Sequence, residues 1–85
     1  MPVEPERPGV GAEAEISEKT KRFVKAELKR ADVTYDELAR RLSSMGIHET
    51  KVSIASKLSR GAFSATFFLA VMKALDRRTL SLEEI

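Results

Sequence analysis

Residues 34–61 read TYDELARRLSSMGIHETKVSIASKLSRG, and this segment decides the fold of the chain. Thr34 and Glu37 have the spacing of a capping box, in which each side chain accepts a hydrogen bond from the other residue's backbone amide. The apolar positions that follow recur at helical spacing: Leu38, Ala39, Leu42 and Met45. Gly46 supplies the left-handed residue on which helices commonly end. The segment therefore predicts a helix over 35–45.

A second amphipathic helix is predicted over 49–60, with Gly61 as its C-terminal glycine. Ile54, Ala55 and Leu58 fall on one face, and serine, lysine and arginine side chains cover the rest. Two packed helices joined by a tight turn are the parts of a helix-turn-helix, a motif that places its second helix in the major groove of DNA.

Two further helices and a short tail complete the expected fold. The first helix is predicted over 17–31, where the apolar positions are Phe23, Val24, Ala26, Leu28 and Ala31. Ser64 is expected to cap a fourth, very apolar helix over 64–75. The tail from 79 onward alternates apolar and polar residues, which fits either a short strand or a final turn of helix. The prediction is a compact all-α, four-helix domain over 17–85.

The N-terminal residues 1–16 differ in composition from the rest. They contain all three prolines and two of the four glycines, and they carry four Glu against one Arg, a net charge of −3. We expect them to be a disordered acidic tail. Residues 17–85 carry 14 basic against 9 acidic residues, a net charge of +5. A basic domain with an acidic extension is typical of nucleic-acid binders, although many small bacterial domains share a modest basic excess.

Composition also excludes several classes of protein. The chain has no cysteine, so it has neither disulfides nor a cysteine-based zinc site. No apolar run approaches the roughly 20 residues of a membrane span, and the acidic N-terminus does not fit a signal peptide. The single histidine, His48, has no visible partner ligands, and no catalytic arrangement is evident. We expect a cytoplasmic protein that is not an enzyme and has no cofactor, metal ion, membrane partner or small-molecule substrate.

The segments LKRADVTYDELARRL (28–42), KLSRG (57–61) and SATFFLAVMKALD (64–76) resemble the lambda-repressor-like helix-turn-helix domains of the Cro and xenobiotic-response-element group. The matching positions are Thr34, Glu37, Leu38, Ala39, Leu42, Arg60, Gly61, Ser64, Leu69, Ala74 and Leu75. The chain also resembles a family of small bacterial proteins of unassigned function that share KxxLKRAxVTYxELAxRL and KLSRGxFSAxFF. The resemblance implies duplex DNA binding by a small transcriptional regulator, with the third helix in the major groove.

One departure from the repressor pattern concerns the turn. After Leu42 the chain reads SSMGIHET, which is longer by about three residues than the turn usual in this motif. Either the second helix runs an extra turn before Gly46, or the turn itself is expanded.

The outer side of the predicted 49–60 helix supplies the main candidates for DNA contact. Lysine and arginine donate to guanine or phosphate, and serine bonds to either. The candidates on this side are Ser53, Ser56, Lys57 and Arg60. Lys51 lies closer to the Ile54/Leu58 stripe, but at the start of the helix its long side chain can still reach a phosphate, so it is a further candidate. On the preceding helix, one of Arg40 and Arg41 is expected to contact phosphate, because the two side chains point about 100° apart. Tyr35 is expected either to contact the backbone of DNA or to pack beneath the helix pair.

The apolar surplus of the C-terminal part suggests an alternative function, a protein-interaction module on a helix-turn-helix fold that does not bind DNA. Phe63 and Phe67 are expected to form an apolar patch, unless the core wraps around both sides of the fourth helix. With Leu80 and Leu82 of the tail, they are the candidate interface of a homodimer.

Overall fold

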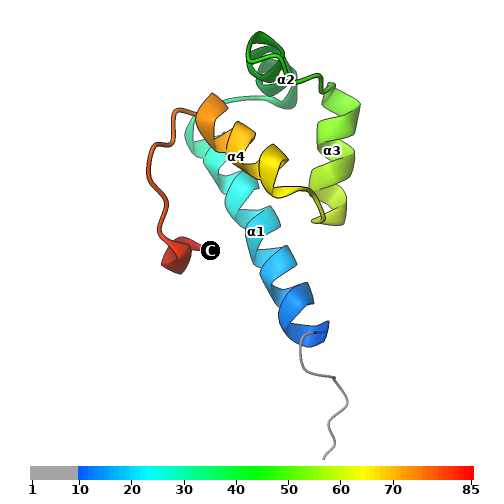
Figure 1. Cartoon of the computed structure of the whole chain (residues 1–85), viewed down its shortest axis with the longest axis vertical. Helices are drawn as coiled ribbons and strands as arrows, with labels where there is room; N and C mark the ends of the chain where they lie inside the picture. Colours follow the sequence, from blue (N-terminus) through cyan, green and yellow to red (C-terminus); the bar gives the residue numbers. More distant parts are fainter. Residues whose placement is uncertain (1–9) are drawn as a thin grey trace, which may run out of the picture.

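The computed structural model describes residues 10–85 and shows an all-α domain (Figure 1). Its elements are α1 (Val10–Arg30), α2 (Tyr35–Ser44), α3 (Lys51–Arg60), α4 (Ala65–Ala74) and the 3-10 helix η1 (Leu82–Glu84). The bounds predicted for the three later helices are confirmed to within two residues. In Figure 1, α4 lies across the long α1, and the C-terminal tail turns back towards α1.

Helix α1 begins at Val10, earlier than predicted, so the expectation that 10–16 lacks structure is wrong. The segment Gly11–Ser17 reads GAEAEIS, and its alanines and glutamates favour a helix. Glu13 also lies in the first turn, where a negative charge stabilises the helix dipole. The part of the predicted tail that precedes Val10 lies outside the described residues.

The core is formed by all four helices. Its most enclosed side chains are Val24, Leu38, Leu42, Ile54, Leu58 and Val71. In α1 the buried stripe runs through Glu27 instead of the predicted Ala26 and Ala31, which are exposed. Met45 was predicted to be buried but is 40 % exposed, because α2 ends at Ser44 and leaves it in the capping turn.

Helices α2, α3 and α4 begin at hydroxyl caps. Each cap accepts a hydrogen bond from the amide three residues on, at 3.1 Å for Thr34, 3.0 Å for Thr50 and 3.0 Å for Ser64. The second half of the capping box predicted at Thr34 is absent, since the Glu37 carboxylate binds two arginines of its own helix. The caps satisfy backbone amides that have no partner within the helix.

Helices α1, α2 and α4 end in the same turn. A residue with positive φ follows each helix: Asp32 (58°), Gly46 (84°) and Asp76 (58°). The amide of the next residue then donates to the carbonyl five residues back, at 2.9, 2.9 and 2.8 Å respectively. These are the hydrogen bonds of the Schellman motif. Among these three residues, only Gly46 is of a type from which the sequence predicts the motif.

Helix α3 ends differently, against α1. Gly61 has φ 70° and is buried, and its carbonyl accepts a hydrogen bond from the Ser17 hydroxyl. A Cβ atom on Gly61 would lie 3.0 Å from Ser17 Oγ. This close approach fixes the C-terminal end of α3 on the N-terminal half of α1.

The connection between α2 and α3 spans residues 45–50. Helix α2 continues two residues past Leu42, and the remaining residues form an expanded turn around Gly46. Both expectations for the longer connection are therefore partly correct. The two helices pack against each other, and in Figure 1 they cross instead of running side by side.

Residues after α4 form a turn and η1, so the strand alternative for the tail is wrong. Arg77 connects this tail to α1. Its guanidinium binds the carboxylates of Glu27, at 2.9 Å, and Glu84, and lies 5.5 Å from the Phe23 ring centroid. Glu27 is only 7 % exposed, and the Arg30 and Arg77 guanidinium groups hold its pKa below the ordinary value despite burial.

Candidate nucleic-acid interface

Helix α3 presents one side to solvent. Ile54 and Leu58 are fully buried, and the helix packs against α2 and α1. The exposed side chains on the opposite side, here named the α3 outer face, are Val52, Ser56, Ser59 and Arg60. Lys51 is also exposed, but it lies about 60° from Ile54 around the helix axis, beside the buried stripe. Two of the predicted DNA-contact residues, Ser56 and Arg60, therefore lie together on the α3 outer face, and Lys51 is exposed at the start of the helix.

Ser53 and Lys57, also predicted to contact DNA, are bound within the protein. The Ser53 hydroxyl accepts from the Thr50 amide at 2.8 Å and donates to the Glu49 carboxylate at 2.6 Å. The Lys57 ammonium binds the same carboxylate and lies 4.8 Å from the Phe67 ring centroid. These bonds use the polar groups of both residues to fix the start of α3, so neither belongs to the α3 outer face.

Glu49 is the centre of this cluster, and its side chain is only 9 % exposed. Burial raises the pKa of Glu49, but hydrogen bonds from Lys57 and Ser53 outweigh that effect and hold the pKa below its ordinary value. Glu49 precedes the helix and lies eight residues before Lys57. No local sequence pattern predicts a contact at this spacing, so Glu49 was missed in the sequence analysis. Val52 was also missed as a site residue, although it lies about 200° from Ile54 on a helix and so opposite the buried stripe.

The candidates on α2 have different surroundings. Tyr35 is half-buried and packs against the core, as in the second of its two expected roles. Arg40 is exposed and pairs with Glu37 at 2.7 Å. Arg41 binds Glu37 and donates to the Ala74 carbonyl at the end of α4, at 3.0 Å. Arg41 thus joins α2 to α4, while Arg40 is the more exposed of the two arginines.

The starts of α2 and α3 lie close together. The Lys51 ammonium is 4.0 Å from the Asp36 carboxylate, and both side chains are mostly exposed. Arg60 stands at the other end of α3 and forms no ion pair within residues 10–85. Basic groups are therefore exposed at both ends of α3.

The apolar residues predicted as an interface patch are arranged differently from the expectation. Phe67 is 4 % exposed and belongs to the core, so its prediction as a surface residue is wrong. Of the adjacent phenylalanines Phe67 and Phe68 in α4, Phe68 is the half-buried one. Phe63 packs edge-on against Phe67, with ring centroids 5.3 Å apart. Leu80 is half-buried against the core, while Leu82 is 83 % exposed.

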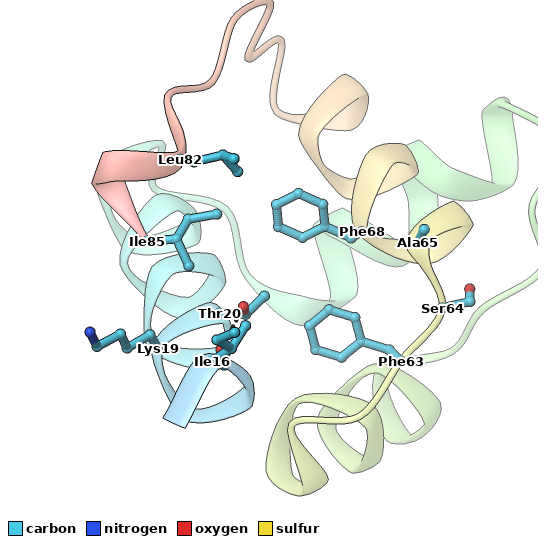
Figure 2. Close-up of a pocket in the computed structure, with 9 residues that line it drawn as sticks. All are labelled: Ile16, Lys19, Thr20, Phe63, Ser64, Ala65, Phe68, Leu82 and Ile85. Carbon is cyan, nitrogen blue, oxygen red and sulfur yellow. Dashed lines mark hydrogen bonds between the residues drawn. The ribbon is translucent and has the colours of Figure 1, made fainter. Parts of the chain in front are cut away.

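An apolar groove of about 570 Å³ lies between α1, the start of α4 and the tail. Figure 2 shows Phe63 and Phe68 on one side and Ile85 and Leu82 of the tail on another, with α1 forming the third wall. The α1 wall consists of Ile16, Lys19 and Thr20. We name this feature the tail groove.

Comparison with known proteins identifies the family. Residues 17–80 match the model of a family described as a domain of unknown function, DUF6471. The chain belongs to the DUF6471 family. The DUF6471 match begins within α1 and ends before η1, so it covers α2, α3 and α4 completely. None of the curated proteins and none of the solved structures compared with it matches the chain.

Within residues 10–85 of this DUF6471 protein, no group of three His, Cys, Asp or Glu side chains is placed to hold a metal ion. His48 is exposed in the connection between α2 and α3. None of the helices in the same range combines the length and the apolar character that crossing a bilayer requires.

Proposed function

We propose that this DUF6471 domain is a binding protein for duplex DNA, with the α3 outer face in the major groove, and that it acts as a small transcriptional regulator in the cytoplasm. The observation that carries the proposal is the composition of that face: one arginine, two serines and a valine, all exposed on a helix whose other side is fully buried, with Lys51 exposed at the start of the same helix. Each of these types makes a defined contact with bases or phosphates.

The spacing of the basic groups suits a groove. Lys51 and Arg60 are nine residues apart on α3, so their Cα atoms are separated by about 13 Å along the helix axis. The major groove is about 12 Å wide. The two side chains can therefore reach phosphates on opposite edges while the residues between them face the bases. Arg40, exposed on α2, is a further candidate for a phosphate contact.

Val52 can give the α3 outer face a preference for particular bases. It is 76 % exposed and stands one helical turn from Ser56 on the same side. An apolar side chain at the floor of the major groove contacts the methyl group of thymine, and a serine hydroxyl bonds to either a donor or an acceptor. The α3 outer face thus has both an electrostatic part and a part that distinguishes base pairs.

The first prediction tests this face by charge-matched variants. Arg60→Ala and Arg78→Ala each remove one positive charge, but Arg78 lies beyond α4 and is exposed, away from α3. We expect Arg60→Ala to weaken binding to random-sequence duplex DNA and to reduce the slope of log affinity against log salt by about one, because one phosphate contact is lost. Arg78→Ala should leave both quantities close to those of the unmodified chain.

Fluorescence anisotropy with a labelled duplex at two salt concentrations measures both quantities, and circular dichroism verifies folding. Equal losses for the two arginine variants would mean that only net charge matters, and would contradict a specific role for the α3 outer face. Absence of binding at low salt would reject DNA as the partner.

The second candidate function is a protein-interaction module that does not bind DNA. The tail groove favours it, because an apolar groove on a small domain is a common feature of interfaces. The two candidates use different surfaces, so variants of α3 and of the groove separate them. Neither candidate requires catalysis, a cofactor or a metal ion.

A further inference from the structure

We infer that the tail groove is the interface of a symmetric homodimer, in which Leu82 of each copy enters the groove of the other. This proposal does not depend on DNA binding, because the α3 outer face and the tail groove have no residue in common. It replaces the predicted Phe63–Phe67 patch by a surface built from α1, α4 and η1.

Two of the five large exposed apolar side chains of the described residues line this groove. The large ones within the described residues are Ile16, Met45, Val52, Leu69 and Leu82. Ile16 and Leu82 line the groove, at 61 % and 83 % exposed. Leu69 follows Ala65, another lining residue, by one turn of α4, so it extends the same apolar surface. A continuous apolar surface of this kind is costly to leave in water.

Leu82 is held in place as a projecting side chain. It begins η1, whose capping box joins Ser81 and Glu84. The Glu84 carboxylate also binds Arg77, which in turn binds the buried Glu27 of α1. The tail is therefore fixed on the domain although Leu82 itself is exposed. Because the backbone that carries Leu82 is already ordered, less conformational entropy is lost on binding than for a free tail.

The occupant is a second copy because the projecting residue and the groove are complementary and lie on one face. A two-fold axis beside such a face brings each projecting side chain to the other copy's groove, which is the requirement for an isologous interface. The charges also match. Glu83, exposed, follows Leu82 directly, and Lys19 stands at the α1 rim of the groove, where its side chain is 51 % exposed and its ammonium lies 3.3 Å from the exposed Glu15 carboxylate of the same helix. Figure 2 shows the Lys19 ammonium pointing outward from that rim.

The test is the mass of the full chain in solution, measured by light scattering and sedimentation equilibrium at tens of micromolar without DNA. We expect about twice the 9.5 kDa of the chain. Leu82→Asp should raise the dimer dissociation constant by on the order of a hundredfold, since two leucines leave the interface. The control is Val52→Asp, which makes the same type of change on α3 and should leave the mass unchanged.

A charge exchange tests the pairing itself. Lys19→Glu alone should weaken the dimer, because it places two carboxylates together, and Lys19→Glu with Glu83→Lys should restore it. A monomer at every concentration for the unmodified chain would overturn the proposal, as would a dimer that persists in Leu82→Asp. Since DNA binding is measured separately through Arg60, failure of the dimer and failure of DNA binding are distinguishable results.

Discussion

Lys57 illustrates how a single basic residue on α3 serves the structure of the domain. Its ammonium binds the nearly buried Glu49 carboxylate and also lies over the Phe67 ring. The attraction between a cation and an aromatic face adds to the ion pair. Removing the lysine would therefore leave an enclosed carboxylate without its charged partner.

The second prediction follows from this pair. Lys57→Met keeps an unbranched side chain over Phe67 but leaves Glu49 unpaired, and should lower the free energy of unfolding by about 1–3 kcal/mol. Adding Glu49→Gln removes the unpaired charge and should recover most of the loss. Urea unfolding followed by circular dichroism measures both variants, with Lys51→Met as the exposed control. If the two substitutions are simply additive, Lys57 and Glu49 are not coupled.

The two left-handed glycines give the third prediction, because they differ only in their surroundings. A Cβ at Gly46 meets nothing within 4 Å, whereas at Gly61 it meets the Ser17 side chain at 3.0 Å. Gly46→Ala should cost only the backbone penalty, about 1–2 kcal/mol. Gly61→Ala should cost about 1–3 kcal/mol more, because Ser17 must shift from its hydrogen bond.

Thermal and urea unfolding of the two alanine variants provide the comparison. In a Ser17→Ala background the steric part of the Gly61→Ala penalty should become smaller. Equal penalties at the two glycines would show that the approach of α3 to α1 tolerates a methyl group.

At the scale of the helices, the sequence predicts what local chemistry determines. Thr34, Ser64, Gly46 and Gly61 act through neighbours within a few residues, so the bounds of α2, α3 and α4 are predictable. Helix α4 marks the limit of this approach. Almost all of its positions are apolar, so periodicity cannot decide which of two adjacent phenylalanines is buried. Phe67, predicted for a surface patch, is the buried one, and Phe68 is only half-buried.

The candidate site was predictable only in part for the same reason. Helical spacing places Ser56 and Arg60 on the outside of α3, and both are exposed there. It places Lys51 nearer the buried stripe, and Lys51 is exposed because it stands at the start of the helix. Lys57 is bound to Glu49 and so does not face solvent as predicted, and this contact depends on the position that Glu49 takes after the turn. Likewise, the binding of Arg77 to Glu27 joins residues fifty positions apart, and no local pattern carries that information.

At the scale of the whole molecule, four carboxylates with lowered pKa values link stability to pH. Arginines hold the pKa of Glu27, Glu37 and Glu84 below its ordinary value, and at Glu49 hydrogen bonds from Lys57 and Ser53 outweigh burial. A carboxyl group of this kind stabilises the folded state above its ordinary pKa of 4.5 and loses that contribution as the pH falls through the lower pKa of the folded state. Of the four, Glu27 joins distant parts of the chain, because its partner Arg77 lies in the tail.

The fourth prediction is therefore an acid-sensitive domain. The free energy of unfolding should be nearly constant between about pH 6 and 7 and should fall progressively below about pH 4.5. Glu27→Gln should flatten this fall, because Glu27 then no longer takes up a proton on unfolding. Urea unfolding at a series of pH values measures the slope, and Glu13→Gln, at an exposed site in the first turn of α1, is the control. An unchanged slope in Glu27→Gln would exclude the buried cluster as its source.

The three helix ends of the Schellman type also bear on how the chain folds. Each closes a loop of only a few residues, so it costs little chain entropy and can form together with its helix within about a microsecond. The hydrogen bond between Ser17 and Gly61 instead joins residues 44 positions apart. The slow step of folding is then expected to be the meeting of α3 with α1, after the helices and their turns have already formed.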